Sequence, residues 1–212
     1  MTDQLLVKLS PMLDLKQVQR EVPHIEDIRV IGIKNEVKEI LLLIKKGYLS
    51  PPKITTLNYV HADKIDLFSF TFEEEERSFC RYDTPLQYIY EPNACILKSG
   101  AFQQIGVQFD LAKLAKHTHL YTSNTLHTDF PGRIFAVQEL LKPKKDVLQK
   151  HLGKPIFAHV VARNFGENAE KIAHNFQIKS KDETTYLLFT QLQDNKKVAI
   201  LAKKLNLKIS NS

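Results

Sequence analysis

Apolar residues in the first part of the chain form short runs that are separated by one-sided helical patterns. The run at residues 4–9 is typical of a buried strand. After it, Leu15, Val18 and Val22 recur at the spacing of one helix face, behind Asp14 in the position of a capping residue. The pattern therefore predicts a strand followed by a helix.

Two more strands are predicted at residues 27–33 and 54–60, where β-branched side chains are frequent. Between them, Asn35 precedes a segment that has glutamates at its start and lysines at its end, and Gly47 follows it. These are the signals that begin and end a helix, so a helix is predicted over residues 36–46. The alternation of strands and helices predicts a mostly parallel sheet.

The pattern changes after residue 60. Phe68, Phe70 and Phe72 alternate with polar residues, which is the period of a half-buried strand. The acidic run at residues 73–76 is expected to be a solvated turn, with a metal site as the less favoured alternative. Residues 78–82 would then form the return strand.

The second half of the chain divides into two patterns. Residues 90–133 are predicted to be helical and irregular, with helices beginning after Asn93 and after Asp110. Residues 133–212 follow the order β-α-β-α-β-β, a ferredoxin-like arrangement with two helices on one face of a sheet. The predicted fold class is α/β to α+β: a partial Rossmann-like parallel sheet followed by this β-α-β-α-β-β domain.

The composition of the 212 residues, with 43% hydrophobic and 25% charged positions, is that of a globular protein. No apolar run approaches the roughly 20 residues that a membrane helix needs, and the first residues do not read as a secretory signal. Cys80 and Cys95 make no disulfide framework, which favours a reducing, cytoplasmic compartment. The glycines form neither GxGxxG nor a P-loop, so no nucleotide-phosphate loop is predicted.

The net charge of +6 is unevenly distributed along the chain. Residues 1–132 hold 15 Lys+Arg and 17 Asp+Glu, a balance of −2, whereas residues 133–212 hold 15 and 7, a balance of +8. A basic module beside a near-neutral one indicates a polyanionic partner such as RNA, and a merely soluble lysine-rich surface is the alternative.

Four lysines in the basic segment are the first candidates for RNA contacts, because each could neutralise a phosphate on a predicted helix. They are Lys142, Lys144, Lys145 and Lys150.

A second group of candidates is Arg163, Asn164 and Phe165, at a predicted strand end. A cation, an amide and an aromatic ring suit phosphate pairing, base-edge hydrogen bonding and stacking on single-stranded RNA. The alternative is an ordinary strand end at which Asn164 turns the chain and Phe165 enters the core.

Tyr90, Glu91 and Asn93 surround Pro92 and form a third candidate group. Either they face a ligand cleft, or they form a well-made turn from a strand to a helix that Asn93 caps. The cluster of His117, His119 and His127 lacks a recognisable zinc spacing, so no metal site is predicted, and no catalytic nucleophile can be assigned.

Six ordered strings resemble the C-terminal portion of a bacterial class I SAM-dependent methyltransferase family whose members end in a THUMP-like domain. They are VKLSPMLD at residues 7–14, NEVKE at 35–39, YEPN at 90–93, THLYTS at 118–123, FPGR at 130–133 and RNF at 163–165.

The resemblance implies three parts. Residues 1–87 would be the last strands of the methyltransferase sheet, residues 88–132 a small ferredoxin-like or helical connecting domain, and residues 133–212 a THUMP-like domain that binds RNA. Arg133, which begins this last part, joins the RNA-binding candidates. S-adenosylmethionine would be held by a preceding half that carries a Gly-rich loop and an Asp-Pro loop, and neither motif is in this sequence.

No cofactor-binding residue is therefore predicted in this chain, and no methylation by the chain alone. Lys8 and Ser10 follow a strand end and could shape a substrate pocket if that half were supplied, although a turn and a cap are their simpler roles.

Three functions follow from these expectations. The first is the substrate-recognition part of an RNA methyltransferase that acts on tRNA or rRNA. The second is a protein-interaction fragment that completes a separately encoded methyltransferase half through an exposed strand edge at residues 4–9. The third, the least favoured, is a small-molecule enzyme with a pocket lined by Tyr90, Glu91 and His119.

Overall fold

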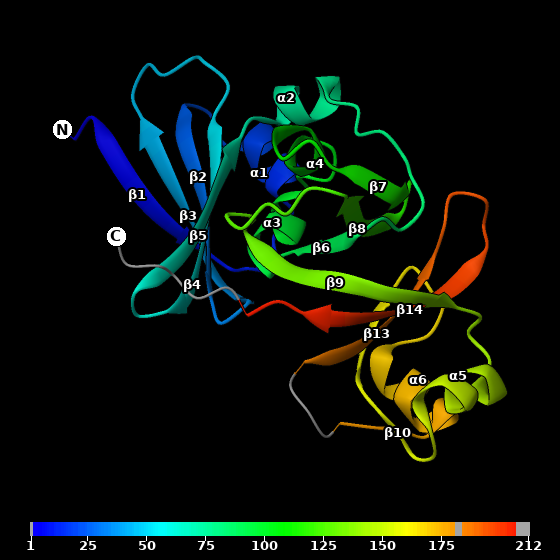
Figure 1. Ribbon diagram of the computed structural model, residues 1–212. Coiled ribbons are helices and arrows are strands. Elements are labelled where there is room, and N and C mark those ends of the chain that lie inside the picture. Colours follow the sequence, from blue (N-terminus) through cyan, green and yellow to red (C-terminus); the bar gives the residue numbers. More distant parts are fainter. Residues whose placement is uncertain (1, 181–183, 207–212) are drawn as a thin grey trace. The chain divides into compact units, whose positions relative to one another are not determined.

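The computed structural model describes residues 2–180 and 184–206. The chain divides into two compact units (Figure 1). Unit 1 comprises Met1–Phe79 with Pro92–Gln108, and unit 2 comprises Cys80–Glu91 with Phe109–Ser212.

Unit 1 is built on a five-stranded sheet whose strand order is β1-β3-β2-β4-β5. The strands are β1 (Gln4–Leu9), β2 (Ile25–Ile33), β3 (Glu36–Lys45), β4 (Lys53–His61) and β5 (Lys64–Phe70). Strands β2 and β4 run parallel, whereas β1 with β3, β2 with β3, and β4 with β5 are antiparallel. The prediction of a mostly parallel sheet is thus wrong, while mixed sheets with helices agree with the α/β to α+β class.

The helix predicted over residues 36–46 is strand β3. Lys34 and Asn35 both have positive φ, 50° and 65°, which is the backbone of a tight type I′ hairpin turn. Asn35 therefore turns a hairpin between β2 and β3 and begins no helix at residue 36. Ile40 and Leu42 of β3 are buried in the sheet. Burial of these side chains therefore outweighs the glutamates and lysines at the two ends of the segment, which favour a helix.

Strand β1 lies at one margin of the sheet (Figure 1). Because β1 and β2 are both antiparallel to β3, they run in the same direction, and helix α1 (Leu15–Glu21) connects them. The prediction of a buried strand at residues 4–9 is wrong in one respect, because Leu5 and Leu6 are 52% and 61% exposed.

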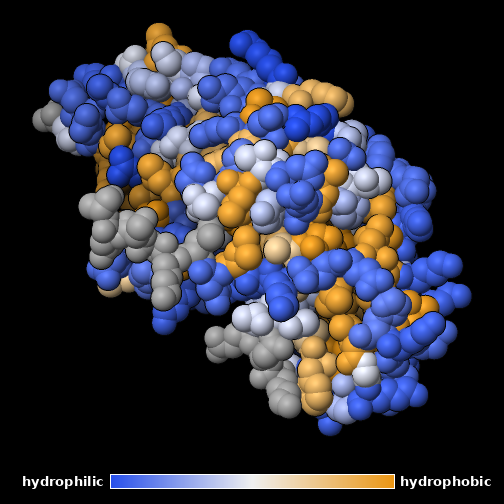
Figure 2. Space-filling model, in the orientation of Figure 1, coloured by the Kyte–Doolittle hydropathy of each residue, from blue (hydrophilic) through white to orange (hydrophobic). Residues whose placement is uncertain are grey.

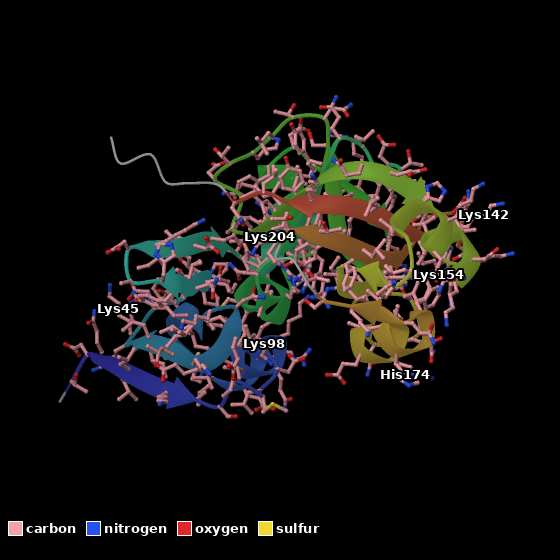
Figure 3. The ribbon with its side chains drawn as sticks, turned by 60° about the horizontal axis from the view of Figure 1, so that its bottom comes forward. Lys45, Lys98, Lys142, Lys154, His174 and Lys204 are labelled. Atoms are coloured by element: carbon pink, nitrogen blue, oxygen red, sulfur yellow. The ribbon has the colours of Figure 1, made fainter. Side chains whose placement is uncertain are left out.

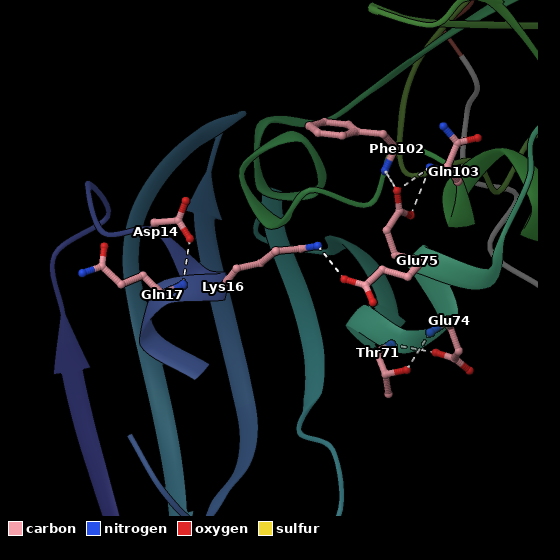
Figure 4. Close-up of polar contacts among 9 residues, drawn as sticks. Asp14, Lys16, Gln17, Thr71, Glu74, Glu75, Phe102 and Gln103 are labelled. Atoms are coloured by element: carbon pink, nitrogen blue, oxygen red, sulfur yellow. Dashed lines mark hydrogen bonds and ion pairs between the residues drawn. The ribbon is translucent and has the colours of Figure 1, made fainter. Parts of the chain in front are cut away.

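The acidic run at residues 73–76 lies within helix α2 (Phe72–Arg77), with its first three glutamates in the first turn, and does not form a turn between strands. Thr71 and Glu74 make a reciprocal capping box (Figure 4). The negative charges of the glutamates in the first turn are stabilised by the positive end of the helix dipole. No strand forms at residues 78–82 beyond an isolated bridge at Tyr82. Among the described residues, no group of three or more metal-ligating side chains is present here or elsewhere.

The remaining helices of unit 1 are α3 (Ala94–Ser99) and α4 (Gln104–Gln108). The carboxylate of Glu75 accepts hydrogen bonds from the backbone N–H groups of Phe102, Gln103 and Gln104 at 2.8–3.0 Å (Figure 4). Helix α2 is thereby tied to the start of α4.

Unit 2 contains a seven-stranded sheet with the order β11-β13-β14-β9-β6-β8-β7. Its strands are β6 (Tyr88–Pro92), β7 (Ala112–Ala115), β8 (Thr118–Ser123), β9 (Gly132–Leu141), β11 (His159–Arg163), β13 (Thr185–Gln191) and β14 (Lys197–Lys204). The helix predicted after Asp110 is strand β7, because Asp110 has a φ of 46° and cannot begin a helix in that conformation.

Two helices cover one face of this sheet, as predicted. They are α5 (Lys145–Leu152) and α6 (Ala169–Phe176), with a small parallel pair of β10 (Ile156–Phe157) and β12 (Ile178–Lys179) beside them. Leu148 of α5 and Ile172 of α6 share a buried cluster with Phe189 of β13. The opposite face forms a second cluster that includes Phe135 and Tyr186.

Candidate nucleic-acid interface

Helix α5 presents a basic surface. Leu148 is fully buried beneath the helix, so the lysines on its other sides are left toward solvent. Lys142, Lys144 and Lys150 are exposed and Lys145 is half-buried. Figure 3 shows Lys142 and Lys154 beside α5 and His174 on α6, and Figure 2 shows hydrophilic residues along the margin of this region.

Within the described residues, no carboxylate neutralises the lysines of this surface. In the part of the chain that the structure describes, neither Lys142, Lys144, Lys145 nor Lys150 lies within ion-pair distance of an acid. The nearby Glu139 pairs with His151, at 3.1 Å between Oε2 and Nδ1. Four ammonium groups are thus available to an external anion, and we call them the α5 lysines.

A second cationic feature lies at the strand ends of unit 2. Arg133 of β9 donates from Nε to Glu91 Oε2 at 2.6 Å, and its terminal nitrogen pairs with the same oxygen. A terminal nitrogen of Arg163, at the end of β11, lies 2.7 Å from Glu91 Oε1. Glu91 is 2% exposed, whereas the side chains of Arg133 and Arg163 are 33% and 39% exposed. One buried carboxylate thus holds two arginines that still reach solvent.

Local sequence explains how Glu91 and Arg133 meet. Gly132 precedes Arg133, and a Cβ at that position would collide with the carbonyl oxygen of Glu91. The missing side chain allows β9 to approach β6 closely. The sequence of residues 130–132 predicts a turn. It gives no local signal that Arg133, the next residue, contacts Glu91, because Glu91 lies 42 positions earlier in the chain.

His119 lies near several cations of this region. Burial and, to a smaller extent, the positive charges of Lys113, Arg163 and His117 together lower the pKa of His119 to about 4. Lys113 is itself buried, and its ammonium donates to the carbonyl oxygen of Lys116 at 2.8 Å. His119 therefore stays neutral at physiological pH.

Two buried donors in this region lack partners within the described residues. They are Nε of Arg163 and the hydroxyl of Thr190. Arg163 and Thr190 are directly paired between β11 and β13, so their side chains lie on the same face of the sheet.

Several predicted site residues have structural roles instead. Tyr90 is fully buried, and its hydroxyl donates to the carbonyl oxygen of Thr125 at 2.6 Å, so it does not line a cleft. Asn93 is buried as the cap of α3, accepting from the N–H groups of Cys95 and Ile96. Tyr90 and Asn93 thus agree with the alternative of a turn from a strand to a helix, and not with a ligand cleft.

Phe165 is also not a stacking platform for bases. It is buried against Phe189, with ring centroids 5.3 Å apart, and the ammonium of Lys197 covers its ring. Asn164 adopts a φ of 54° and donates to the hydroxyl of Thr118, as a turning residue would.

The predicted cleft residues are divided between the two units. Lys8, Ser10 and Asn93 belong to unit 1, whereas Tyr90, Glu91 and His119 belong to unit 2. Lys8 pairs with Glu39 at 2.9 Å, and the hydroxyl of Ser10 accepts from the N–H of Met12 at 3.2 Å.

One open cavity of unit 1 lacks the features of a site for S-adenosylmethionine. This cavity of about 370 Å³ is bordered by Val22–Ile25 and by residues 48–52. These segments precede β2 and β4, so the cavity lies at the amino ends of the two parallel strands, whereas ligands of α/β sheets bind at the carboxyl ends. The border contains no glycine, and its one carboxylate is Glu73. The residues present do not fit the cofactor.

Comparisons with known proteins define two domain classes in the second part of the chain. Residues 88–131 match a ferredoxin-like domain, and residues 132–204 match a THUMP-like domain. The matched segments together run from β6 to the end of β14.

Among solved structures, the chain is similar to the crystal structure of a "putative methyltransferase from Porphyromonas gingivalis W83". The sequences are 30% identical, the TM-score is 0.88, and the match covers 96% of this chain and 52% of that one. The chain thus spans about half the length of this relative. No curated protein matches the sequence significantly. No helix in the described residues is both long and apolar enough to span a membrane.

Proposed function

We propose that the chain binds RNA and serves as the substrate-recognition part of a SAM-dependent RNA methyltransferase in the cytoplasm. The observation that carries the proposal is the set of unneutralised α5 lysines on a THUMP-like domain. THUMP domains are RNA-binding parts of RNA-modifying enzymes. The similarity to the methyltransferase named above supports methylation as the modification.

The physical basis is the release of counterions. Each lysine that neutralises a phosphate contributes about −0.7 to the slope of log affinity against log salt on single-stranded RNA. Contacts of this kind position the RNA and do not select its sequence. Binding is therefore expected to be tight at low salt, and we expect tRNA or rRNA to be the substrate.

The test removes lysines whose side chains have no hydrogen bond or ion pair within the described residues. Lys142, Lys144 and Lys150 are exposed, so their replacement by glutamine leaves the core of unit 2 intact. The matched control replaces Lys34, Lys46 and Lys53 of unit 1, which are also exposed and unpaired in the described structure.

Binding of pooled tRNA and of structured rRNA is measured by fluorescence anisotropy at two salt concentrations. The α5 triple variant should lose at least tenfold in affinity and about 2 units of salt slope, while the control variant keeps both. Absence of RNA binding by the unmodified chain at low salt rejects the proposal.

In this proposal S-adenosylmethionine is held by another methyltransferase segment and not by this chain. Isothermal titration of the chain with S-adenosylmethionine should give no heat beyond dilution. Saturable binding at micromolar concentration would contradict the assignment.

A second candidate function is completion of a separately encoded methyltransferase half, and the margin of the unit 1 sheet favours it. Among the described residues, no strand pairs with the outer edge of β1, which carries exposed leucines on both of its faces and invites pairing with another strand. Ile33, Tyr59 and Ile65 are exposed cross-strand neighbours on the outer face of the same sheet.

This candidate is tested with a separately expressed SAM-binding half. Co-purification in a 1:1 complex, abolished by Leu6→Lys and by Leu5→Lys, is the expected result. A monodisperse monomer that does not bind the added half would exclude the candidate.

A further inference from the structure

Unit 2 carries a second set of cations, distinct from the α5 lysines: Arg133 and Arg163, which we call the arginine pair. Glu91 is the one carboxylate that contacts them among the described residues. Two full positive charges therefore share one negative charge, and a net positive charge remains at a partly exposed position.

The cluster keeps unused hydrogen-bonding capacity. A guanidinium has five N–H donors, and one terminal nitrogen of Arg163 donates to the carbonyl oxygen of Ala162. The other lies in ion-pair contact with Glu91 Oε1, although that oxygen accepts no hydrogen bond in the described structure, where Nε of Arg163 also has no partner. The fully buried hydroxyl of Thr190, on the same sheet face, is also without a partner there. Buried donors without acceptors are costly, and a bound anion is one way in which they are satisfied.

The geometry also restricts the arginines before any ligand binds. Glu91 fixes one edge of Arg133, and the guanidinium carbon of Arg133 lies 5.6 Å from the ring centre of Phe135 and 5.9 Å from that of Tyr186. A planar guanidinium can donate two parallel hydrogen bonds to the oxygens of a phosphate, which a lysine ammonium cannot. Because these guanidinium groups are already held in place, they lose less conformational entropy on binding than mobile lysines do.

We propose that the arginine pair is a built phosphate subsite, which takes one phosphate group of the RNA, and that Glu91 is its positioning residue. The inference deepens the proposed function and rests on it for the source of the phosphate. The α5 lysines then supply general attraction, while the arginine pair fixes one point of the strand.

The test neutralises the whole cluster, because removing the arginines alone would leave Glu91 buried without a partner. The variant Glu91→Gln/Arg133→Gln/Arg163→Gln lowers the net charge by one. The matched control, Arg81→Gln, changes the charge by the same amount in the same unit by breaking an exposed ion pair with Asp110. Binding of single-stranded RNA is measured against salt, and melting is measured with inorganic phosphate replacing chloride at constant ionic strength.

The expected result is a loss of about tenfold in RNA affinity and of about 0.7 in salt slope for the cluster variant, as one phosphate contact requires, with Arg81→Gln unchanged. Inorganic phosphate should raise the melting temperature of the unmodified chain and of Arg81→Gln but not that of the cluster variant.

Unchanged RNA affinity in the cluster variant overturns the inference, even if inorganic phosphate binds, and leaves the proposed function intact where the α5 lysine variant still loses affinity. Equal stabilisation of all three proteins by phosphate also overturns it. Failure of the unmodified chain to bind any RNA defeats the proposed function, and the phosphate measurement then decides separately whether the arginine pair holds phosphate at all.

Discussion

The guanidinium of Arg133 contacts the carboxylate of Glu91, with 2.6 Å between Nε and Oε2, and the two side chains differ sharply in exposure. Glu91 is almost completely buried, whereas a third of the Arg133 side chain reaches solvent. The contact is therefore unequal: the arginine can be rehydrated if its partner is lost, but the glutamate cannot.

This inequality predicts different costs for removing the two partners. Replacing both Arg133 and Arg163 by methionine should lower the free energy of unfolding by about 3 kcal/mol, because a charged carboxylate is left buried and unpaired. Glu91→Gln should cost about 1 kcal/mol, since an amide fills the same space and the arginines remain partly hydrated. Urea denaturation of the two variants measures the difference, and equal costs would contradict the burial argument.

Gly132 provides a prediction about the close approach of β6 and β9. Gly132→Ala would place a Cβ against the carbonyl oxygen of Glu91, so the two strands must separate, at a cost of about 3 kcal/mol. Gly47→Ala is the control: its φ of 78° strains an alanine, but no atom lies near the added Cβ, and about 1 kcal/mol is expected. Thermal melting compares the two, and a smaller effect at Gly132 would count against the packing argument.

Glu75 is predicted to stabilise the start of α4 through its carboxylate. Both of its oxygens accept backbone N–H groups, and an amide in Glu75→Gln retains only one acceptor. The variant should lose about 1–2 kcal/mol of unfolding free energy, since partly buried N–H groups lose their partner. Glu73→Gln, at an exposed position of the same helix, should change it by less than about 0.5 kcal/mol. Hydrogen exchange at the amides of Gln103 and Gln104 reports the same loss locally.

The elements that local chemistry specifies were predictable from the sequence. The order β-α-β-α-β-β of residues 133–212 depends on such signals: helix α5 ends at Gly153 with a φ of 84°, and the hairpin of β13 and β14 turns at Asn195, which also has positive φ. Asn35 and Asp110 were misleading, because asparagine and aspartate adopt positive φ in strand connections as readily as they cap helices.

The candidate site was only partly predictable for a different reason. The α5 lysines form a local cluster, so charge along the sequence is enough to find them. Contacts of Glu91 with Arg133 and Arg163 depend on how distant strands meet, and no local signal encodes that. Phe165 was misjudged because an aromatic residue at a strand end looks the same in sequence whether it faces the core or the solvent.

The last prediction concerns pH and His119, whose pKa is lowered to about 4 by burial and by neighbouring cations. In the unfolded chain this imidazole titrates near pH 6.5, so between pH 6.5 and pH 4 the unfolded state binds more protons than the folded state. Stability therefore rises with pH across this window and is lost as the pH falls.

After a discount for the partial exposure of His119, the loss between pH 7 and pH 4.5 should be about 1–2 kcal/mol. His119→Gln should flatten the unfolding free energy over this window relative to the unmodified chain, while His174→Gln, at an exposed position on α6, should not. Urea denaturation at half-unit pH intervals measures both profiles. Parallel profiles for the unmodified chain and His119→Gln would show that this histidine is not held neutral by the fold.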